Sequence, residues 1–439
     1  MGDLGPMKAV SARERLEQAL ARIADPAGEG ARACLTVYAD TARAAADASD
    51  ARAKAGRPLG PLDGAIVSIK DLFDVAGEVT RAGSRVLAGE GLVAKADAPA
   101  VARLRAAGAV IVAKTNMTEF AFSGVGANPH FGTPGNPFDR ARVPGGSTSG
   151  GAVAVADGMC EIAIGTDTGG STRIPAALCG IVGWKPSKQR VPTDGAFPLS
   201  FTLDSIGPMA GSVAECAAAD AVMAGEPPPA LEPAPLSGLR LGILQGMPFE
   251  GIDSTVAAAW SAGIDAFGRA GVRFSDERIA LIDDMIAVNA KGGFAPAEAY
   301  AIHRERLKAR GAGIDPNVRS RIERGAGVSA ADCIEMAQAR ARLVKAMDAR
   351  LASLDALALP TTPIAAPRLA EVATPEDFGR RNAMLLRNTA MVNFFDLCAV
   401  SLPLPRVGRL ATGLMLVGRN GQDRRLIQFA AAFERAFAA

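Results

Sequence analysis

Two glycine-framed serine loops are the segments of this sequence whose residue types suggest chemistry. Residues 144–151 read PGGSTSGG and residues 165–175 read GTDTGGSTRIP, so that Ser147 and Ser171 lie 24 positions apart. Glycine permits backbone conformations and close approaches that a β-carbon forbids. Such loops can therefore aim consecutive N–H groups at an anion beside a serine hydroxyl.

Known glycine-rich motifs do not account for these loops. A phosphate-binding loop needs Gly-Lys-Ser/Thr after its glycines, a nucleophile elbow needs Gly-x-Ser-x-Gly, and the β-lactamase pattern needs Ser-x-x-Lys. Neither serine loop has any of the three. A purely structural loop is the remaining alternative for a single Gly-Gly-Ser, and the recurrence of the pattern argues against it.

The second loop meets two needs of amide hydrolysis by a serine. That reaction requires a deprotonated nucleophile, donors for the oxyanion and an acid for the leaving amine. The amides of a tight turn converge beside the hydroxyl that the turn carries. Ser171 is therefore the candidate nucleophile, and the candidate oxyanion hole consists of Thr168, Gly169, Gly170 and Ser171.

Lys70 is the candidate base. It follows residues 64–69, a short β-branched segment that is typical of a buried strand. Burial disfavours the ammonium form and can lower the pKa of a lysine enough to give a neutral amine at physiological pH. The alternative role for Lys70 is a solvated charge at the strand end, paired with Asp71.

Histidine is scarce, which narrows the alternatives. The chain has two, His130 and His303, and no H-E-x-x-H zinc spacing. His130 lies beside Asn128-Pro129 in a turn-like stretch, where a surface or capping role is expected; a base for the serine is its competing role. We expect no metal site and no organic cofactor.

The elements that must position these residues alternate between helix and strand. A helix is predicted to begin at a cap on Asp97 and to end at Gly108, and residues 109–113 are the strand that follows. The same unit recurs within residues 253–274. This alternation indicates the α/β class.

We predict a single domain over residues 1–439. Residues 7–24 and 32–54 are expected to be helical, residues 225–236 to form a proline-rich surface connection, and residues 283–350 to form a charged helical segment. Length alone favours two or three domains, but one large sheet can absorb a chain of this length.

The composition excludes several classes of partner. The chain has 48 Lys+Arg against 46 Asp+Glu and no block of five like charges, so a nucleic-acid partner is not expected. No apolar run reaches the roughly 18 residues of a membrane-spanning helix, and the first 26 residues are too charged for a signal peptide. The six cysteines contain no CxxC pair. We expect a soluble, cytoplasmic protein.

The chemistry-bearing segments together resemble the amidase signature family. Its specific motifs lie within about residues 60–215, and weaker matches follow near the end of the chain. The matching segments are the strand with Lys70, AKTNMTEF at 113–120, Asn136-Pro137, the two serine loops, GWKPS at 183–187, LPTTP at 359–363 and residues 393–403.

The resemblance implies a Ser–cis-Ser–Lys triad. Ser171 matches the nucleophile of the family, Ser147 the bridging serine after a cis peptide bond, and Lys70 the base. Neutral Lys70 takes a proton through Ser147 from Ser171, which attacks the carbonyl. The relay then runs backwards to the leaving amine, and water repeats the sequence on the acyl-enzyme. This is a Ser-Lys variant of triad logic.

The resemblance also implies a fold and further site residues. The fold is a large mixed β-sheet flanked by helices on both faces, and a homodimer is what many relatives suggest. Arg173 is a candidate for binding a substrate carboxylate, although an internal pair with Asp167 is the safer interpretation. By position, four residues are expected to line the acyl pocket: Phe120, Ala121, Phe122 and Ser123.

The leading hypothesis is an amidase that hydrolyses a small carboxamide to a carboxylate and ammonia through a Ser171 acyl-enzyme. The amidase subunit of a glutamyl-tRNA(Gln)-type amidotransferase is the first alternative, and the lack of a partner-binding tail weighs modestly against it. A non-catalytic binding protein is the second, and the presence of Lys70, Ser147 and Ser171 argues against it. Aliphatic, aryl, ureido and malonamate-like amides all remain open as substrates.

Overall fold

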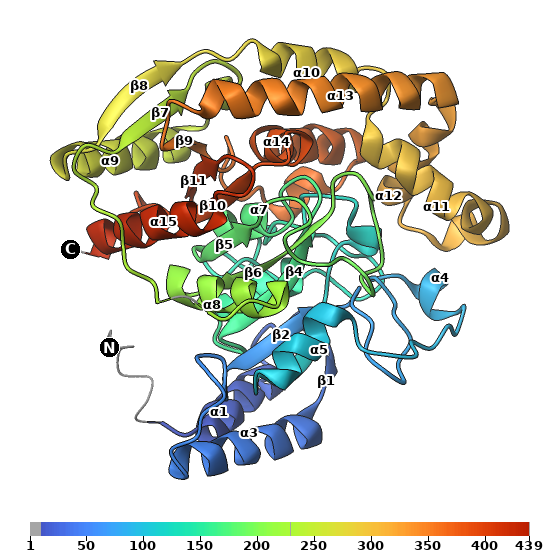
Figure 1. Cartoon of the computed structure of the whole chain (residues 1–439). Coiled ribbons are helices and arrows are strands. Elements are labelled where there is room, and N and C mark those ends of the chain that lie inside the picture. Colours follow the sequence, from blue (N-terminus) through green and yellow to red (C-terminus); the bar gives the residue numbers. More distant parts are fainter. Residues whose placement is uncertain (1–9, 229, 439) are drawn as a thin grey trace.

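The computed structural model describes residues 10–228 and 230–438, and in them one sheet of 11 strands runs through the molecule (Figure 1). In chain order the strands are β1 (Cys34–Val37), β2 (Ile66–Lys70), β3 (Val110–Thr115), β4 (Ile162–Asp167), β5 (Val182–Lys185), β6 (Ser205–Ala210), β7 (Arg240–Leu244), β8 (Arg273–Glu277), β9 (Ala356–Pro360), β10 (Cys398–Pro403) and β11 (Gly413–Gly418).

The sheet contains both parallel and antiparallel strand pairs, as predicted. Its strands lie in the order β1-β3-β2-β4-β6-β5-β10-β11-β9-β7-β8. Strand β2 runs parallel to both β3 and β4, and β7 runs parallel to both β8 and β9. The other neighbouring pairs are antiparallel. Because β2 and β4 are parallel neighbours, their carboxyl ends meet at one edge of the sheet.

The α-helices of the described residues connect and cover these strands. They are α1 (Ala12–Ala24), α2 (Gly30–Ala33), α3 (Ala39–Lys54), α4 (Arg85–Ala88), α5 (Pro99–Ala106), α6 (Ser149–Ala156), α7 (Arg173–Cys179), α8 (Val213–Ala224), α9 (Ser254–Arg269), α10 (Leu281–Asn289), α11 (Phe294–Arg310), α12 (Pro316–Glu323), α13 (Ala330–Leu351), α14 (Pro375–Phe394) and α15 (Asp423–Ala438).

Both faces of the sheet are buried at strand β2. Successive strand residues point to opposite faces. Val67 and Ile69 belong to a core cluster with residues of α5, α8 and α15, whereas Ile66 belongs to a second cluster with residues of α1 and α6. Figure 1 shows α8 and α15 lying along the sheet. The prediction of helices on both faces is confirmed.

The two serine loops lie at the starts of two helices. The first loop leads into α6, which packs against β2 and β4, and the second connects the end of β4 to α7. Lys70 is the last residue of β2. The sheet edge and the two helices therefore bring three distant parts of the chain together.

Two predicted elements differ in detail. The alanine-rich stretch 32–54 is not one helix, because residues 34–37 form strand β1, which pairs with β3 before α3 begins. Thr36 and Val37 are β-branched residues that favour a strand locally, and pairing with β3 uses that preference. Asp97 does not cap α5; its carboxylate accepts from the Ala76 amide (2.9 Å), and Ala98 occupies the cap position. Asp253 does cap α9, as predicted.

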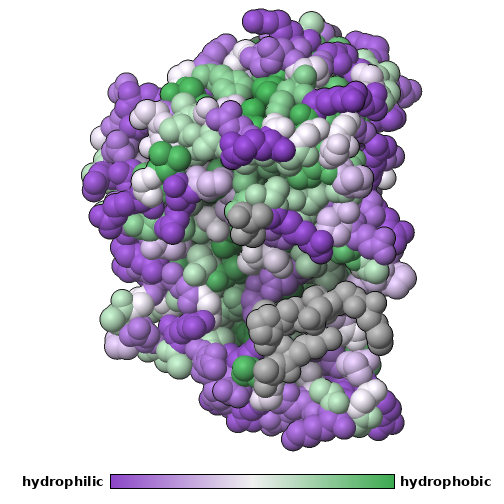
Figure 2. Space-filling model, turned by 90° about the vertical axis from the view of Figure 1, so that its left-hand side faces the viewer, coloured by the Kyte–Doolittle hydropathy of each residue, from purple (hydrophilic) through white to green (hydrophobic). Residues whose placement is uncertain are grey.

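The surface mixes hydrophilic and hydrophobic residues. In the side view of Figure 2, hydrophilic residues predominate along the rim and hydrophobic ones gather toward the middle. None of the helices in the described residues combines the length and the apolar character that crossing a membrane requires.

Candidate active site

Lys70 lies buried at the carboxyl end of β2 and contacts two hydroxyl groups. Its side chain has no exposed surface. The Nζ atom donates to Ser147 Oγ at 2.8 Å and to Thr166 Oγ1 of β4 at 3.0 Å. A solvated charge paired with Asp71 is thus wrong for Lys70, because Asp71 pairs with Arg81 instead (2.8 Å).

The surroundings of Lys70 favour its neutral form. Burial lowers the pKa of Lys70 to about 7, while the negative charges of Asp204 and Asp167 act in the opposite direction. A lysine with this pKa is unprotonated in about half of the molecules near neutral pH. Lys70 can therefore accept a proton under ordinary conditions.

The first serine loop brings Ser147 to this amine through tight glycine packing. The Gly146–Ser147 peptide bond is cis, as the resemblance implied, and Ser147 is fully buried. Gly145 has φ +81°, and a β-carbon at Gly146 would lie 2.6 Å from the Gly126 nitrogen. Neither position accepts a side chain, which explains the glycine pair.

The second serine loop lies directly against the first. The amide of Thr148 donates to the carbonyl of Ser171 at 3.3 Å. Gly170 has φ +132°, and a β-carbon there would lie 2.2 Å from Thr389 Oγ1. Ser171 is 3% exposed and lines a cavity, whereas Ser147 and Lys70 are fully buried and do not line it. The three triad residues named by the resemblance therefore share one buried site.

The amides around Ser171 divide into two groups. The amide of Gly170 donates to the Asp167 carboxylate at 2.8 Å, and Gly170 does not line the cavity, so its predicted place in an oxyanion hole is wrong. Gly169 and Ser171 do line the cavity, and no hydrogen bond of their amides is found within residues 10–228 and 230–438. These two amides are available as donors.

Arg173 holds the loop together and does not face the cavity. Its guanidinium pairs with Asp167 (2.8 Å), and neither side chain has exposed surface. It also donates to the Thr389 carbonyl (3.1 Å) and to Asn393 Oδ1 (2.7 Å). Burial alone would raise the pKa of Asp167, but the Arg173 charge holds it well below its usual range. The role predicted for Arg173 on a substrate is wrong, and the internal pair is correct.

The cavity beside Ser171 measures about 250 Å³ and is mostly apolar. Ala121, Phe122 and Ser123, three of the residues expected to line an acyl pocket, line this cavity. Phe120 does not; it is 1% exposed and packs against the His303 ring, with 4.1 Å between the centroids. Its backbone has φ +52°, in the left-handed region, and its side chain belongs to the core.

Comparisons with known proteins agree with these motifs. A family model described as Amidase matches residues 14–427. The chain belongs to the amidase family.

Two relatives within the family differ in what their names describe. The 2-amino-5-chloromuconic acid deaminase of Comamonas testosteroni is 35% identical over 398 residues, which cover 90% of this chain and 86% of the relative. A glutamyl-tRNA(Gln) amidotransferase subunit of Symbiobacterium thermophilum is 37% identical over 470 aligned positions, covering 97% and 93%. The family is therefore clear, and the role within it is open.

A solved structure agrees with the fold over the whole chain. A crystal structure of an amidase matches with a TM-score of 0.87 and 32% sequence identity, covering 98% of this chain and 97% of its own. The amidase fold is thus shown by both sequence and structure.

Sequence reasoning missed the opposite wall of this amidase cavity. It comes from the α10–α11 connection, from α12 and from α14, and of its residues only Phe394 falls within a matching segment, residues 393–403. These lining residues include Asn289, Phe294, Arg321, Leu386 and Phe394. The available signal was the Gly292-Gly293 pair, which has positive φ at both positions and allows the wall to turn between α10 and α11.

Arg321 is the charged residue of that wall. Its guanidinium carbon lies 4.6 Å from the centroid of the Phe122 ring, and its Nε has no hydrogen-bond partner in the described part of the chain. No carboxylate among those residues forms an ion pair with it. Burial, with a contribution from the Arg324 charge, lowers the pKa of Arg321 to about 10, so it carries a positive charge at neutral pH.

Neither histidine lines the cavity beside Ser171. His130 Nε2 lies 3.0 Å from Glu119 Oε2, and His130 is absent from the lining. His303 is fully buried against Phe120, and burial lowers its pKa to about 3. In residues 10–228 and 230–438, no cluster of three or more His, Cys, Asp or Glu side chains has an arrangement that could hold a metal ion.

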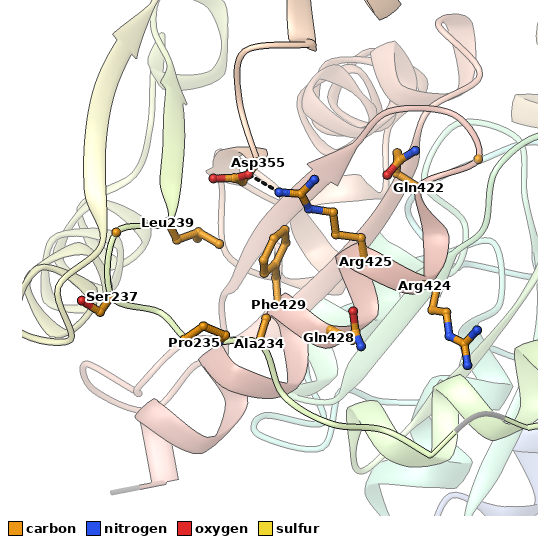
Figure 3. A pocket seen from close by; sticks show the side chains of 12 residues that line it. Ala234, Pro235, Ser237, Leu239, Asp355, Gln422, Arg424, Arg425, Gln428 and Phe429 are labelled. Atoms are coloured by element: carbon orange, nitrogen blue, oxygen red, sulfur yellow. Dashed lines mark hydrogen bonds and ion pairs between the residues drawn. The ribbon is translucent and has the colours of Figure 1, made fainter.

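A larger depression of about 600 Å³ lies elsewhere, against α15 (Figure 3). It contains none of the motif residues. Its Arg425 is already paired with Asp355, as Figure 3 shows. Size alone therefore does not identify the functional cavity.

Proposed function

We propose that this protein is an amidase that hydrolyses a small carboxamide to a carboxylate and ammonia, with Ser171 forming an acyl ester. One observation carries the proposal: the buried contact of 2.8 Å between Lys70 Nζ and Ser147 Oγ, beside a cavity lined by Ser171. The low pKa of Lys70 supports its role as the base.

In the first half-reaction, neutral Lys70 accepts the proton of Ser147, which accepts the proton of Ser171. The Ser171 oxygen bonds to the amide carbon, and the negative charge that forms on the carbonyl oxygen is stabilised by the amides of Gly169 and Ser171. When the C–N bond breaks, Ser147 gives its proton to the leaving nitrogen, and Lys70 returns a proton to Ser147. Ammonia leaves, and an ester remains on Ser171.

In the second half-reaction, water takes the place of the amine. Its proton passes through Ser147 to Lys70 as the water oxygen bonds to the ester carbon. The collapse of this intermediate breaks the ester bond, and the same relay returns the proton to Ser171. The enzyme is then restored without any external reactant other than water.

The cavity wall supports a substrate class. Arg321 is a cation without a carboxylate partner in the described residues, and it stands over the ring of Phe122. Arg321 is partly buried, and a guanidinium in such a place binds carboxylates well because its planar N–H donors match the two carboxylate oxygens and water competes less there. We therefore assign to the substrate an anionic group on its acyl part, separated from the amide by an apolar segment. The relative named for an acid, 2-amino-5-chloromuconic acid, is in line with this.

The alternative is a subunit role in a tRNA-dependent amidotransferase. It is favoured by the relative from Symbiobacterium thermophilum, which matches 97% of this chain. The two functions differ in their need for partner chains. An independent amidase releases ammonia from amides alone, whereas a subunit does so at an appreciable rate only with its companions.

The purified protein should decide between them. Ammonia release is measured on pairs of amides that differ only in a terminal carboxylate, without any partner chain. Ser171→Ala is the blank. Ser149→Ala is the matched control, because Ser149 is a buried hydroxyl two positions from Ser147 that has no hydrogen-bond partner in the described residues. We expect the wild type and the control to be active and the blank to be inactive.

An intercepted acyl group tests the covalent step. Hydroxylamine added to the working enzyme should yield a hydroxamate of the substrate acid, because it competes with water for the Ser171 ester. An active enzyme that gives no hydroxamate, or a Ser171→Ala variant that keeps its activity, contradicts the proposal. Ammonia release that appears only after partner chains are added supports the subunit role.

A further inference from the structure

Residues 199–204 form a loop that joins the cavity wall to the nucleophile loop. The loop precedes β6, which pairs antiparallel with β4 so that Ser205 lies opposite Asp167. One residue beyond this pair, Asp204 therefore faces Thr168. The side chains of Leu199 and Leu203 line the same cavity as Thr168.

The Asp204 carboxylate bridges the two loops. Its Oδ1 accepts from Thr168 Oγ1 at 2.5 Å. Its Oδ2 accepts from the amides of Leu199 (2.9 Å) and Ser200 (3.1 Å). One oxygen thus fixes the loop to which Asp204 belongs, and the other fixes Thr168.

Thr168 is the last residue with a side chain before the glycines that carry the donors. Gly169 and Gly170 have no β-carbon to restrict them. The other anchors in this stretch are the Gly170 amide on Asp167 and the Gly169 carbonyl, which accepts from Thr389 Oγ1 at 2.5 Å. Thr168 is the anchor at the start, and its hydroxyl is held by Asp204.

We propose that Asp204 is a positioning residue for amide hydrolysis, which acts through the Thr168 hydroxyl to hold the donor amides of Gly169 and Ser171 in place. The proposal rests on the proposed function, since it takes Ser171 as the nucleophile. The Asp204 carboxylate also links two parts of the cavity. It holds the loop that carries Leu199 and Leu203, which line the cavity, and it holds Thr168, which precedes the donor amides.

Asp204 has a second effect, on the charge around the base. The negative charges that act to raise the pKa of Lys70 are those of Asp204, from the loop before β6, and Asp167, from β4. Asp167 is paired with the Arg173 guanidinium, and Lys188 Nζ donates to the Asp204 backbone carbonyl at 3.1 Å. Removal of the Asp204 charge takes away a contribution that raises the pKa of Lys70, so the acid limb of the pH profile should move to lower pH.

Three variants separate the two effects. Thr168→Val removes the hydroxyl and keeps the Asp204 charge, so kcat should fall about tenfold or more while the acid limb stays in place. Thr168→Ser restores the hydroxyl and should recover most of kcat. Asp204→Asn leaves one acceptor oxygen in place of two, so either Thr168 or the amides of Leu199 and Ser200 lose their acceptor and kcat should fall. Because the charge is also removed, the acid limb should move to lower pH.

A matched control comes from the same loop. Thr202→Val makes the same chemical change, but the Thr202 hydroxyl donates to Glu298 of α11 instead of holding the nucleophile loop. Its kcat should stay within about twofold of the wild type. All rates are expressed per active site, titrated by the burst of acyl-enzyme, so that loss of folded protein does not count as loss of kcat.

Two results would overturn the inference. One is a Thr168→Val enzyme with wild-type kcat per titrated site, and the other is an Asp204→Asn enzyme with wild-type kcat per titrated site. If Asp204→Asn does not fold, the Thr168 pair carries the test alone. Activity that remains in Ser171→Ala would contradict the proposed function itself. The Thr168 and Asp204 variants test only the positioning role of Asp204.

Discussion

Two buried lysines occupy similar places in the sheet and have different partners. Lys70 ends β2 and Lys185 ends β5, and both side chains are at most 1% exposed. Burial lowers the pKa of Lys70 to about 7 and, with the Arg173 charge, that of Lys185 to about 8. The Nζ atom of Lys70 contacts hydroxyls, whereas that of Lys185 donates to two backbone carbonyls.

The difference lies in what each partner does with a proton. A hydroxyl both accepts and donates, so a proton can pass through it to another group, whereas a carbonyl oxygen only accepts. Burial makes both lysines able to titrate near neutral pH. The partner decides whether that titration can serve a reaction, and only Lys70 has such a partner.

Exchange of each lysine for methionine should produce the largest effects. Lys70→Met removes the base and is expected to lower kcat by about 10³-fold or more in a folded protein. Lys185→Met leaves the carbonyls of Pro186 and Leu397 unpaired, at a cost of about 1–3 kcal/mol each in the free energy of unfolding, while kcat per active site stays near wild type. Active-site titration and thermal unfolding of both variants check this. Equal loss of kcat in the two variants would contradict the view that Lys70 takes part in catalysis and Lys185 does not.

The pH profile should report Lys70. Protonated Lys70 cannot accept the proton of Ser147, so kcat/KM should fall about tenfold per pH unit below its pKa of about 7 and level off above it. Lys185→Met should keep this profile. A rate that is independent of pH between 5 and 9 in the wild type would exclude Lys70 as the base.

Arg321 extends the comparison to a partly buried cation that lines the cavity. Arg321→Met should raise KM about tenfold to hundredfold for an amide that carries a carboxylate, because a charge-assisted hydrogen bond contributes about 1.5–3 kcal/mol. The neutral partner of each substrate pair should show little change. KM values for both amides check this. An equal rise in KM for both would mean that Arg321 affects the shape of the cavity and does not bind the carboxylate.

The stability of the protein should show the cost of burying Lys70. The unfolded chain holds the lysine proton up to a pKa of 10.5, whereas the folded protein releases it near 7. Between these pH values the unfolded state binds more protons, so the free energy of unfolding of the wild type rises with pH. Lys70→Met should therefore melt higher than the wild type at pH 6, and the gap should shrink toward pH 10. A gap that is constant across this range would contradict the burial effect.

The smallest effect is expected at His130. Its Nε2 contacts Glu119 and not the cavity. His130→Gln keeps a donor for that carboxylate, so kcat/KM should stay within about threefold of the wild type. A loss as deep as that of Ser171→Ala would give His130 the role of the base and end the distinction between the two lysines.

The motif residues could be read from the sequence because their chemistry is local. Gly145 and Gly146 mark the close approach beside Ser147, and the glycine pair before Ser171 marks the second loop. Local patterns failed to predict side-chain positions that depend on residues distant in the sequence. Phe120 sits in a matching motif, yet its backbone turns its ring into the core. Arg173 follows the nucleophile, yet Asp167 binds it.

The sequence by itself determined the α/β class, the two serine loops and the strand that ends in Lys70, because residue types and spacing fix turns, caps and buried strands locally. Only the tertiary structure decided that Lys70 reaches Ser147, which of the loop amides remain available, and that Arg321 and Ser171 line the same cavity. These contacts join residues far apart in the chain, and their energies depend on burial and on partners that no local pattern specifies.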